Sequence, residues 1–149
     1  MNINYFMQKA IDEAIKAQLN DEVPIGAVLV NNNDGKIIFS AHNLVNNENN
    51  ATKHAEMVVI QESCKILKTK ILTNTSLFVT LEPCAMCAAA ISEVHIDRIY
   101  FGAYDEKKGS LESIMKIYAT KNFFVPEIYG GICENMCSYI LKNFFKKKR

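Results

Sequence analysis

The sequence predicts an α/β fold in which one sheet lies between layers of helices. Short apolar segments of strand length alternate with longer segments whose apolar residues recur at helical spacing. The chain has 149 residues, of which 49% are hydrophobic and 22% charged, as is usual for a globular protein. We therefore expect residues 1–149 to form a single domain.

The first half of the chain predicts a helix, a hairpin and a second helix. Residues 1–20 carry apolar side chains on one helical face. Residues 25–30 and 36–40 are the expected strands, and an Asp-Gly pair marks the turn between them. Residues 54–67 follow a polar loop and are apolar around much of their helical circumference, which predicts a buried helix.

The second half continues the alternation of strands and helices. Its expected elements are a strand at 76–80, a helix at 84–94, a strand at 97–103, a helix at 110–119, a strand at 123–128 and an amphipathic helix at 132–147. Pro126 cannot donate a backbone hydrogen bond and places the last strand at a sheet edge or a bulge.

Cysteine usage and hydropathy predict the compartment. The N-terminal segment shows helical periodicity and has no continuous apolar signal region, and no apolar run reaches the length of a membrane span. Five cysteines, an odd number without a secretory signal, indicate a reducing environment with free or metal-bound thiols. We expect a cytoplasmic protein that does not bind membranes.

Charge is distributed unevenly along the chain. The net charge of +1 combines −3 over residues 1–104 with +4 over residues 105–149, and the last four residues are Lys-Lys-Lys-Arg. A basic end is typical of proteins that bind an anionic partner such as RNA. A short terminal run is also compatible with a solvated tail that binds nothing.

The stretch "TLEPCAMCAAAISEV" places Cys84 and Cys87 at the start of a helix, directly after Pro83. Residues three apart share one helical face, and the positive end of the helix dipole favours thiolates. Such a pair binds a metal or exchanges a disulfide. The redox alternative needs an exposed motif, whereas the second cysteine leads into an apolar helix.

A metal site needs a further ligand, and His54 is the best candidate of the three histidines because it also opens a buried helix after a loop. Two helix starts at one edge of a sheet would bring His54 to the cysteines. Three protein ligands with one open position are typical of catalytic zinc. We expect Cys64, Cys133 and Cys137, which lie on apolar helical faces, to be core residues.

Glu56 lies in the first helical turn, two residues after His54. An acid at this position has a simple structural explanation, because acidic side chains stabilise helix N-termini. The functional interpretation is a general acid/base beside a zinc-bound water. "HAE" and "PCAMC" together match the H-x-E…P-C-x-x-C signature of zinc nucleobase deaminases.

Beyond this signature, the chain resembles the bacterial tRNA-specific adenosine deaminases, the TadA family. The matching stretches are "EVPIGAVLV", "HAEM", "LFVTLEPCAMCAAAI", "RIYFGAYDEKKGS" and "NFFKKKR". The resemblance implies a cytidine deaminase-like fold, a three-layer α/β/α sandwich with a central mixed five-stranded sheet. It also implies that adenosine is converted to inosine at the wobble position of a tRNA anticodon.

The same resemblance implies the site. His54, Cys84 and Cys87 would hold one Zn²⁺ per subunit, a zinc-bound hydroxide would attack C6 of adenine, and Glu56 would shuttle protons. Substrate-binding positions would be Asn43, Val23, Pro24 and Asp105. The expected partners are a tRNA anticodon stem-loop and a second copy of the chain in a homodimer, with the basic end contacting phosphates.

Two segments depart from the family pattern. "ATKNFFVPEI" lacks the usual Pro…Asn-His stretch, and "SEVHIDR" differs from the usual sequence before the strand. Neither includes a zinc ligand, but the first bears on RNA contacts. The alternatives are therefore a zinc deaminase that acts on a free base or nucleoside of the guanine or cytosine type, and a non-catalytic RNA-binding subunit with the same fold.

Overall fold

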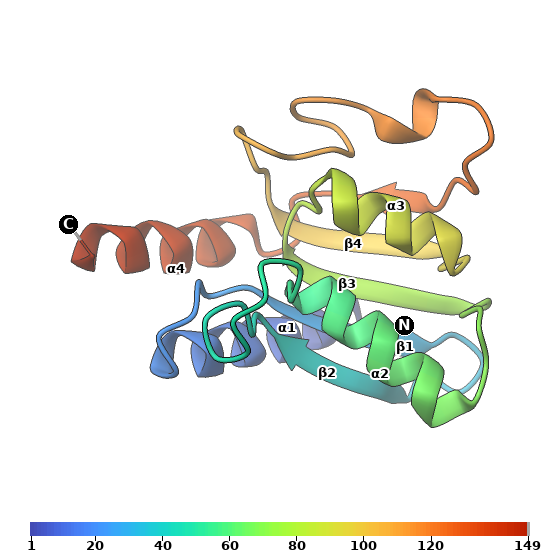
Figure 1. The fold of residues 1–149 in the computed structure, drawn as a ribbon, viewed down its shortest axis with the longest axis horizontal. Coiled ribbons are helices and arrows are strands. Elements are labelled where there is room, and N and C mark those ends of the chain that lie inside the picture. The colour runs from blue at the N-terminus through green and yellow to red at the C-terminus, as the bar shows by residue number, and fades with distance from the viewer. Residues whose placement is uncertain (149) are drawn as a thin grey trace.

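The fold is one five-stranded sheet covered by helices on both faces, as the computed structural model of residues 1–148 shows (Figure 1). The strand order is β2-β1-β3-β4-β5, with antiparallel pairing on both sides of β1 and parallel pairing from β3 to β5. The strands are β1 (Gly26–Asn31), β2 (Ile37–His42), β3 (Thr75–Leu81), β4 (Arg98–Ala103) and β5 (Glu127–Tyr129). The expected mixed sheet is confirmed.

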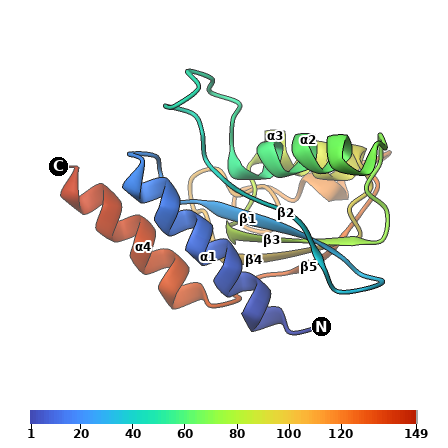
Figure 2. The same cartoon turned by 90° about the horizontal axis from the view of Figure 1, so that it is seen from below.

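Four α-helices form the outer layers of the sandwich. They are α1 (Ile3–Leu19), α2 (Ala55–Leu67), α3 (Ala85–Glu93) and α4 (Glu134–Lys147). Helices α1 and α4 lie side by side on one face of the sheet, and α2 and α3 cover the other (Figure 2). Within residues 1–148, no helix combines the length and apolar composition needed to cross a membrane.

The central strands are buried on both faces, and their side chains alternate between two cores. In β1, Leu29 packs under α2 and α3, whereas Val28 packs under α1 and α4. In β3 and β4, Phe78 and Tyr100 stack in the second core with ring centroids 4.6 Å apart. The largely apolar sequences of these strands follow from this double burial.

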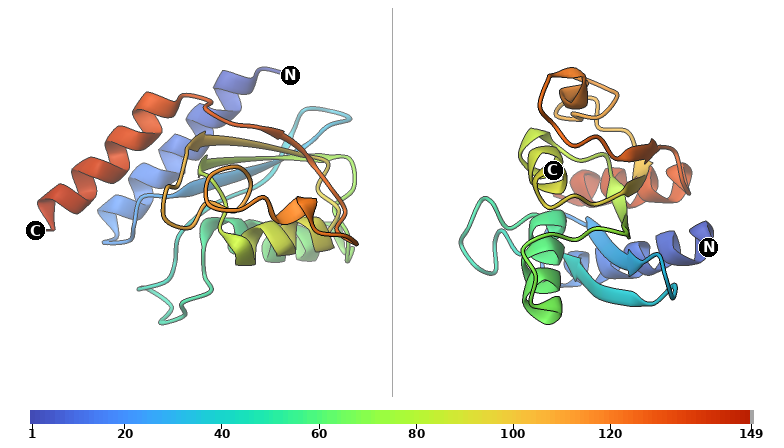
Figure 3. Two further views of the ribbon diagram at one scale, coloured as in Figure 1. Left: turned by 90° about the horizontal axis from the view of Figure 1, so that it is seen from above. Right: turned by 90° about the vertical axis from the view of Figure 1, so that its right-hand side faces the viewer.

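The sheet directions decide where α2 and α3 begin. Because β1 is antiparallel to both β2 and β3, these two strands run in the same direction. The chain leaves the carboxyl ends of β2 and β3 at one edge of the sheet, where α2 and α3 then begin. Two long connecting segments, the loop before α2 and the stretch between β4 and β5, project from the sheet and its helices (Figure 3).

Two expectations for the second half need correction. The helix predicted at 110–119 is wrong, because only Ile117–Ala119 forms a short 3-10 helix η1. The backbone N–H groups of Ile114 and Met115 both bind the Gly109 carbonyl instead of making helical i→i−4 bonds, and those of residues 111–113 bind the carboxylate of Glu82. The last strand is an edge strand as expected, but it begins after Pro126 and covers Glu127–Tyr129. Arg149 of the basic end lies outside the described residues.

Gly26 allows β1 to approach α1 closely. A Cβ atom at this position would lie 2.0 Å from the Ala10 carbonyl oxygen and 2.6 Å from the Ala14 nitrogen, both of them backbone atoms. We expect Gly26→Ala to lower the free energy of unfolding by about 3 kcal/mol, since neither backbone can move without disturbing the core. Urea denaturation at neutral pH measures this.

Asn33→Ala is the matched control, because Asn33 is exposed in the turn that follows the same strand. It should change the free energy of unfolding by no more than about 0.5 kcal/mol. Equal denaturation midpoints for Gly26→Ala and the parent protein would contradict the close approach of β1 and α1.

Candidate active site

The start of α2 and the start of α3 bring His54, Cys84 and Cys87 together. His54 and Cys84 are the N-cap residues of their helices, and Cys87 lies in the first turn of α3. The His54 Nδ1 atom is 3.7 Å from Cys84 Sγ and 3.5 Å from Cys87 Sγ. The three possible ligand atoms all lie within 4.8 Å of one another.

These separations fit a zinc ion. A tetrahedral zinc with bonds of about 2.3 Å to sulfur and about 2.0 Å to nitrogen spaces its ligand atoms about 3.5–3.8 Å apart. Thiolate and imidazole are also the ligand types that zinc prefers. The group comprises three residues among those described, and two of them, His54 and Cys84, are partly exposed. This is the composition of a catalytic rather than a structural zinc site.

The cluster favours one thiolate over the other. Hydrogen bonds from Cys87 and His54 lower the pKa of the Cys84 thiol to about 3, against the opposing effect of burial. The hydrogen bond to Cys84 in turn raises the pKa of His54. The pKa of Cys87 is raised by its own hydrogen bond to Cys84 and by burial. A thiolate that is already present at neutral pH is the form that binds a metal.

Glu56 is the buried acid beside this cluster. Its side chain lies in the first turn of α2 and is 4% exposed. Burial is the largest influence and raises the pKa of Glu56 to about 7, although His54 lowers it. A carboxyl group that titrates near neutral pH can both accept and return a proton, which is the requirement for a general acid/base.

Asn43 has a structural role that the sequence did not reveal. Its side-chain carbonyl Oδ1 accepts a hydrogen bond of 2.8 Å from the backbone N–H of Ala55. Because His54 makes no side-chain cap hydrogen bond, Asn43 satisfies a free N–H at the start of α2 in its place. Asn43 thus links the end of β2 to the start of α2, the helix that carries His54 and Glu56.

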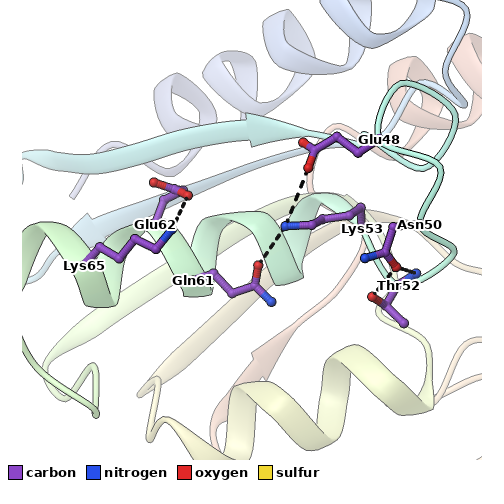
Figure 4. A network of polar contacts seen from close by, with 7 residues as sticks. All are labelled: Glu48, Asn50, Thr52, Lys53, Gln61, Glu62 and Lys65. Atoms are coloured by element: carbon purple, nitrogen blue, oxygen red, sulfur yellow. Dashed lines mark hydrogen bonds and ion pairs between the residues drawn. The ribbon is translucent and has the colours of Figure 1, made fainter.

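The loop between Asn43 and His54 is fastened at both ends. Near α2, the Lys53 ammonium lies 3.1 Å from the Gln61 side-chain oxygen and 3.8 Å from the Glu48 carboxylate (Figure 4). Asn50 accepts hydrogen bonds from the backbone and the hydroxyl group of Thr52 in the same loop. These contacts fix the backbone that leads into His54.

At its other end the loop is bound to Glu22, which is 1% exposed. The Glu22 carboxylate accepts hydrogen bonds from the backbone N–H groups of Asn46 and Asn47, at 3.0 and 2.8 Å. Burial opposes ionisation of this acid, but these hydrogen bonds outweigh it and hold the pKa of Glu22 below its ordinary value. Glu22 therefore joins the start of β1 to the loop that carries Asn43.

Val23 and Asp105 line a surface cavity of about 560 Å³, whereas Pro24 is buried. The cavity lies between the end of β4, residues 104–108 and α4, and its lining includes none of His54, Glu56, Cys84, Cys87 and Asn43. Lys108 connects the two regions, because it lines the cavity and its charge lowers the pKa of His54. The residues predicted for the site thus fall into an inner group around His54 and a separate rim, which is the part of the surface that lines this cavity at residues 104–108 and α4.

Several polar residues of this region could not be identified from the sequence. Glu22 and Glu82 are buried acids that bind backbone N–H groups of loops far away in the chain. An acid before an apolar strand or a proline looks like a surface residue when no partner is visible, so only the fold reveals it.

The three remaining cysteines lie outside the cluster, with Cys137 buried and Cys64 and Cys133 half-buried.

Comparisons with known proteins agree with this geometry. Residues 1–103 match the family described as the cytidine and deoxycytidylate deaminase zinc-binding region. The chain is 43% identical over 144 residues to a tRNA-specific adenosine deaminase of Rickettsia bellii, covering 96% of this chain and 99% of that protein. It is 44% identical over 145 residues to the enzyme of the same name from Bacillus subtilis, covering 97% and 89%.

Solved structures show the same relationship. A structure from a study of A-to-I editing by tRNA:A34 deaminases superposes with a TM-score of 0.88 at 43% identity, covering 92% of this chain and 99% of the other. A guanine deaminase from Nitrosomonas europaea gives a TM-score of 0.82 at 17% identity, covering 95% and 83%, which shows a common fold alone.

The Glu22 contacts predict a pH-dependent contribution to stability. We expect Glu22→Gln to lower the free energy of unfolding by about 2 kcal/mol at pH 7, because the amide accepts fewer hydrogen bonds from Asn46 and Asn47. A depressed pKa in the folded state stabilises the protein above the ordinary pKa of glutamate, and this contribution is lost as the pH falls through the folded value.

Urea denaturation at pH 7 and at successively lower pH measures the free energy of unfolding of the variant and of the parent protein. The gap between these two free energies should narrow below about pH 4.5. Glu93→Gln, the same exchange at an exposed acid at the end of α3, is the control and should give no such gap. A difference that stays constant down to about pH 3 would mean that Glu22 is not bound as a carboxylate.

Proposed function

The chain belongs to the family of tRNA-specific adenosine deaminases, hydrolases that cleave a carbon–nitrogen bond, and on this premise we propose that it converts adenosine to inosine at the wobble position of a tRNA anticodon. The observation that carries the proposal is the position of the buried Glu56 directly beside the His54, Cys84 and Cys87 cluster. Relatives that share nearly the whole chain supply the substrate class.

The proposed reaction is hydrolytic and consumes one water. The water oxygen bonds to C6 of adenine, the bond from C6 to the amino nitrogen breaks, and ammonia leaves. A bound zinc ion supplies a Lewis acid that lowers the pKa of water toward neutrality. Glu56 takes a proton from the attacking water and passes it to the ring nitrogen. It then takes the remaining proton from the hydroxyl group now on C6 and gives it to the leaving amine, so that the C6 carbonyl forms as ammonia leaves.

The chain's own residues orient the reactants. His54, Cys84 and Cys87 hold one zinc ion per subunit. The Asn43 Nδ2 group donates a hydrogen bond to the base, since its carbonyl oxygen is occupied by Ala55 N–H. A stacked base hides C6, so the substrate base must be splayed out of its strand, and an anticodon loop offers such bases at low energetic cost.

The basic end of the chain lies beside the rim cavity and supports RNA as the substrate. Lys107, Lys142 and Lys146 surround a hollow next to Phe145. Lys148 is paired with the Asp21 carboxylate, which ties the end of α4 to the turn before Glu22. Lysines gathered at one rim would contact phosphates without reading sequence.

The partners and location follow from the same substrate. We propose a homodimer in which RNA lies across both subunits, and exposed apolar side chains such as Ile114, Met115 and Val125 are candidates for contact with a second copy. A tRNA substrate implies a cytoplasmic location, and the five free thiols are compatible with the reducing environment there. The second candidate function, deamination of a free base, would leave the basic rim without a role.

The metal ligands can be tested without activity. We expect Cys87→Ser to weaken zinc binding by at least about tenfold, because a serine hydroxyl is a poor replacement for a thiolate ligand. Cys64→Ser is the matched control, since Cys64 lies outside the cluster, and it should keep the zinc content of the parent protein. Elemental analysis after dialysis against a weak chelator measures both. Equal zinc loss from the two variants would remove Cys87 from the ligand set.

The reaction is tested with the zinc-loaded protein and an adenosine-bearing anticodon stem-loop, beside free adenosine, cytidine and guanine. We expect inosine in the RNA and no ammonia from the free compounds. Glu56→Gln should reduce kcat by about 10²–10⁴ with unchanged zinc content, because an amide cannot carry the proton. Glu62→Gln, an exchange on the outer side of α2 (Figure 4), should leave kcat unchanged.

Ammonia released from a free base, with the RNA left unmodified, would support the deamination reaction but would show that the substrate is a free base and not tRNA. An active Glu56→Gln variant would remove Glu56 from the mechanism.

A further inference from the structure

A single buried carboxylate organises the segment between β4 and η1. The Glu82 side chain is 2% exposed and lies immediately after β3. Its Oε2 atom accepts hydrogen bonds from the backbone N–H groups of Leu111, Glu112 and Ser113, at 3.1, 2.8 and 3.0 Å. Its Oε1 atom accepts from the backbone N–H of Asp105 at 3.1 Å and from the Ser113 hydroxyl.

The segment is shaped to enclose this carboxylate. A Cβ atom on Gly109 would lie 2.4 Å from Glu82 Oε1 and 2.5 Å from the Asp105 carbonyl oxygen, so a glycine is needed for the approach. Gly109 also donates its N–H to the Asp105 carbonyl, and Ser110 donates to the carbonyl of Pro83. The turn therefore closes around Glu82 from both ends.

The enclosed segment carries the rim of the proposed RNA site. The Asp105 side chain accepts hydrogen bonds from the backbone N–H groups of Lys107 and Lys108, which fixes the direction of the chain between them. Asp105, Lys107 and Lys108 line the rim cavity, and Lys108 also acts electrostatically on His54. Glu82 binds the N–H groups of residues 111–113, which belong to the turns found in place of the helix predicted at 110–119.

We propose that Glu82 is a positioning residue for substrate RNA, which holds residues 105–113 in the conformation that places Asp105, Lys107 and Lys108 at the rim. The inference rests on the proposed function. Glu82 is not a catalytic residue, because five donors already occupy its two oxygens and its side chain is closed off from solvent.

A competing explanation is that Glu82 supports the metal ligand Cys84, which follows it by two residues in the sequence. The donors to its carboxylate all come from the segment 105–113, and the fixed backbone of Pro83 separates it from Cys84. Loss of the Glu82 carboxylate should therefore loosen the rim while the metal cluster keeps its ligands. Binding of RNA and binding of zinc distinguish these two roles.

The test compares Glu82→Gln with Glu62→Gln in the full zinc-loaded protein. The amide introduced by Glu82→Gln would offer one acceptor oxygen and would turn an NH₂ group toward backbone N–H donors. We expect the KM for the anticodon stem-loop to rise about tenfold with kcat within about twofold of the parent protein, since the loss affects substrate binding and not the reaction step. Zinc content should stay unchanged, and amide hydrogen exchange should accelerate at residues 105–113.

Two further variants change the residues that surround the Glu82 carboxylate rather than Glu82 itself. Gly109→Ala places a methyl group against the carboxylate and should reproduce the rise in KM, and Ser113→Ala removes one donor and should produce a smaller rise. These variants keep the proposal testable if Glu82→Gln fails to fold. Glu62→Gln should match the parent protein in every measurement.

The outcomes separate the two proposals. If the parent protein forms no inosine in RNA, the proposed function is wrong, and with it the role of Glu82 toward RNA. If the parent protein is active and all three rim variants keep its KM, only the positioning role is overturned. A fall in zinc content and kcat with unchanged KM in Glu82→Gln would assign Glu82 to the metal site and would also overturn the proposal.

Discussion

The site depends on the packing of α2 and α3 side by side on one face of the sheet. His54 and Cys84 are 30 positions apart in the chain, and they meet because β2 and β3 run in the same direction on either side of the antiparallel β1. Both helices then begin at the same edge, and each presents its N-cap side chain to the other. The direction of the strands and the packing of the helices therefore place these side chains close to one another.

Buried acids around this edge show how environment gives one side chain different properties. Glu22 and Glu82 accept several backbone hydrogen bonds, which keep their pKa values low despite burial. Glu56 is buried with fewer donors, and burial dominates its pKa. Two acids are thus ionised at neutral pH and organise loops, and the third is suited to exchange a proton. The same residue type serves structure and chemistry according to the number of donors around it.

The sequence predicted those elements whose pattern of apolar residues is set by burial of one or both faces. The apolar strands, the amphipathic α1 and α4 and the start of each central helix were predicted within a few residues, because burial on one or both faces sets these patterns. The helix expected at 110–119 does not form, because the N–H groups of Ile114 and Met115 both bind the Gly109 carbonyl and the helical i→i−4 bonds are not made. The N–H groups of residues 111–113 bind Glu82, which lies far earlier in the chain. The grouping of His54 with both cysteines was predictable from their motifs, whereas the roles of Glu22 and Glu82 and the cap function of Asn43 depend on long-range contacts that no local pattern encodes.

The Asn43 cap links two properties that a protein usually adjusts separately. The oxygen of this amide completes the first turn of α2, and its NH₂ group is the one that we propose binds the substrate base. A residue that improved recognition at this position without a side-chain acceptor would weaken the helix that holds His54 and Glu56, and a better helix cap without a donor would contribute nothing to recognition.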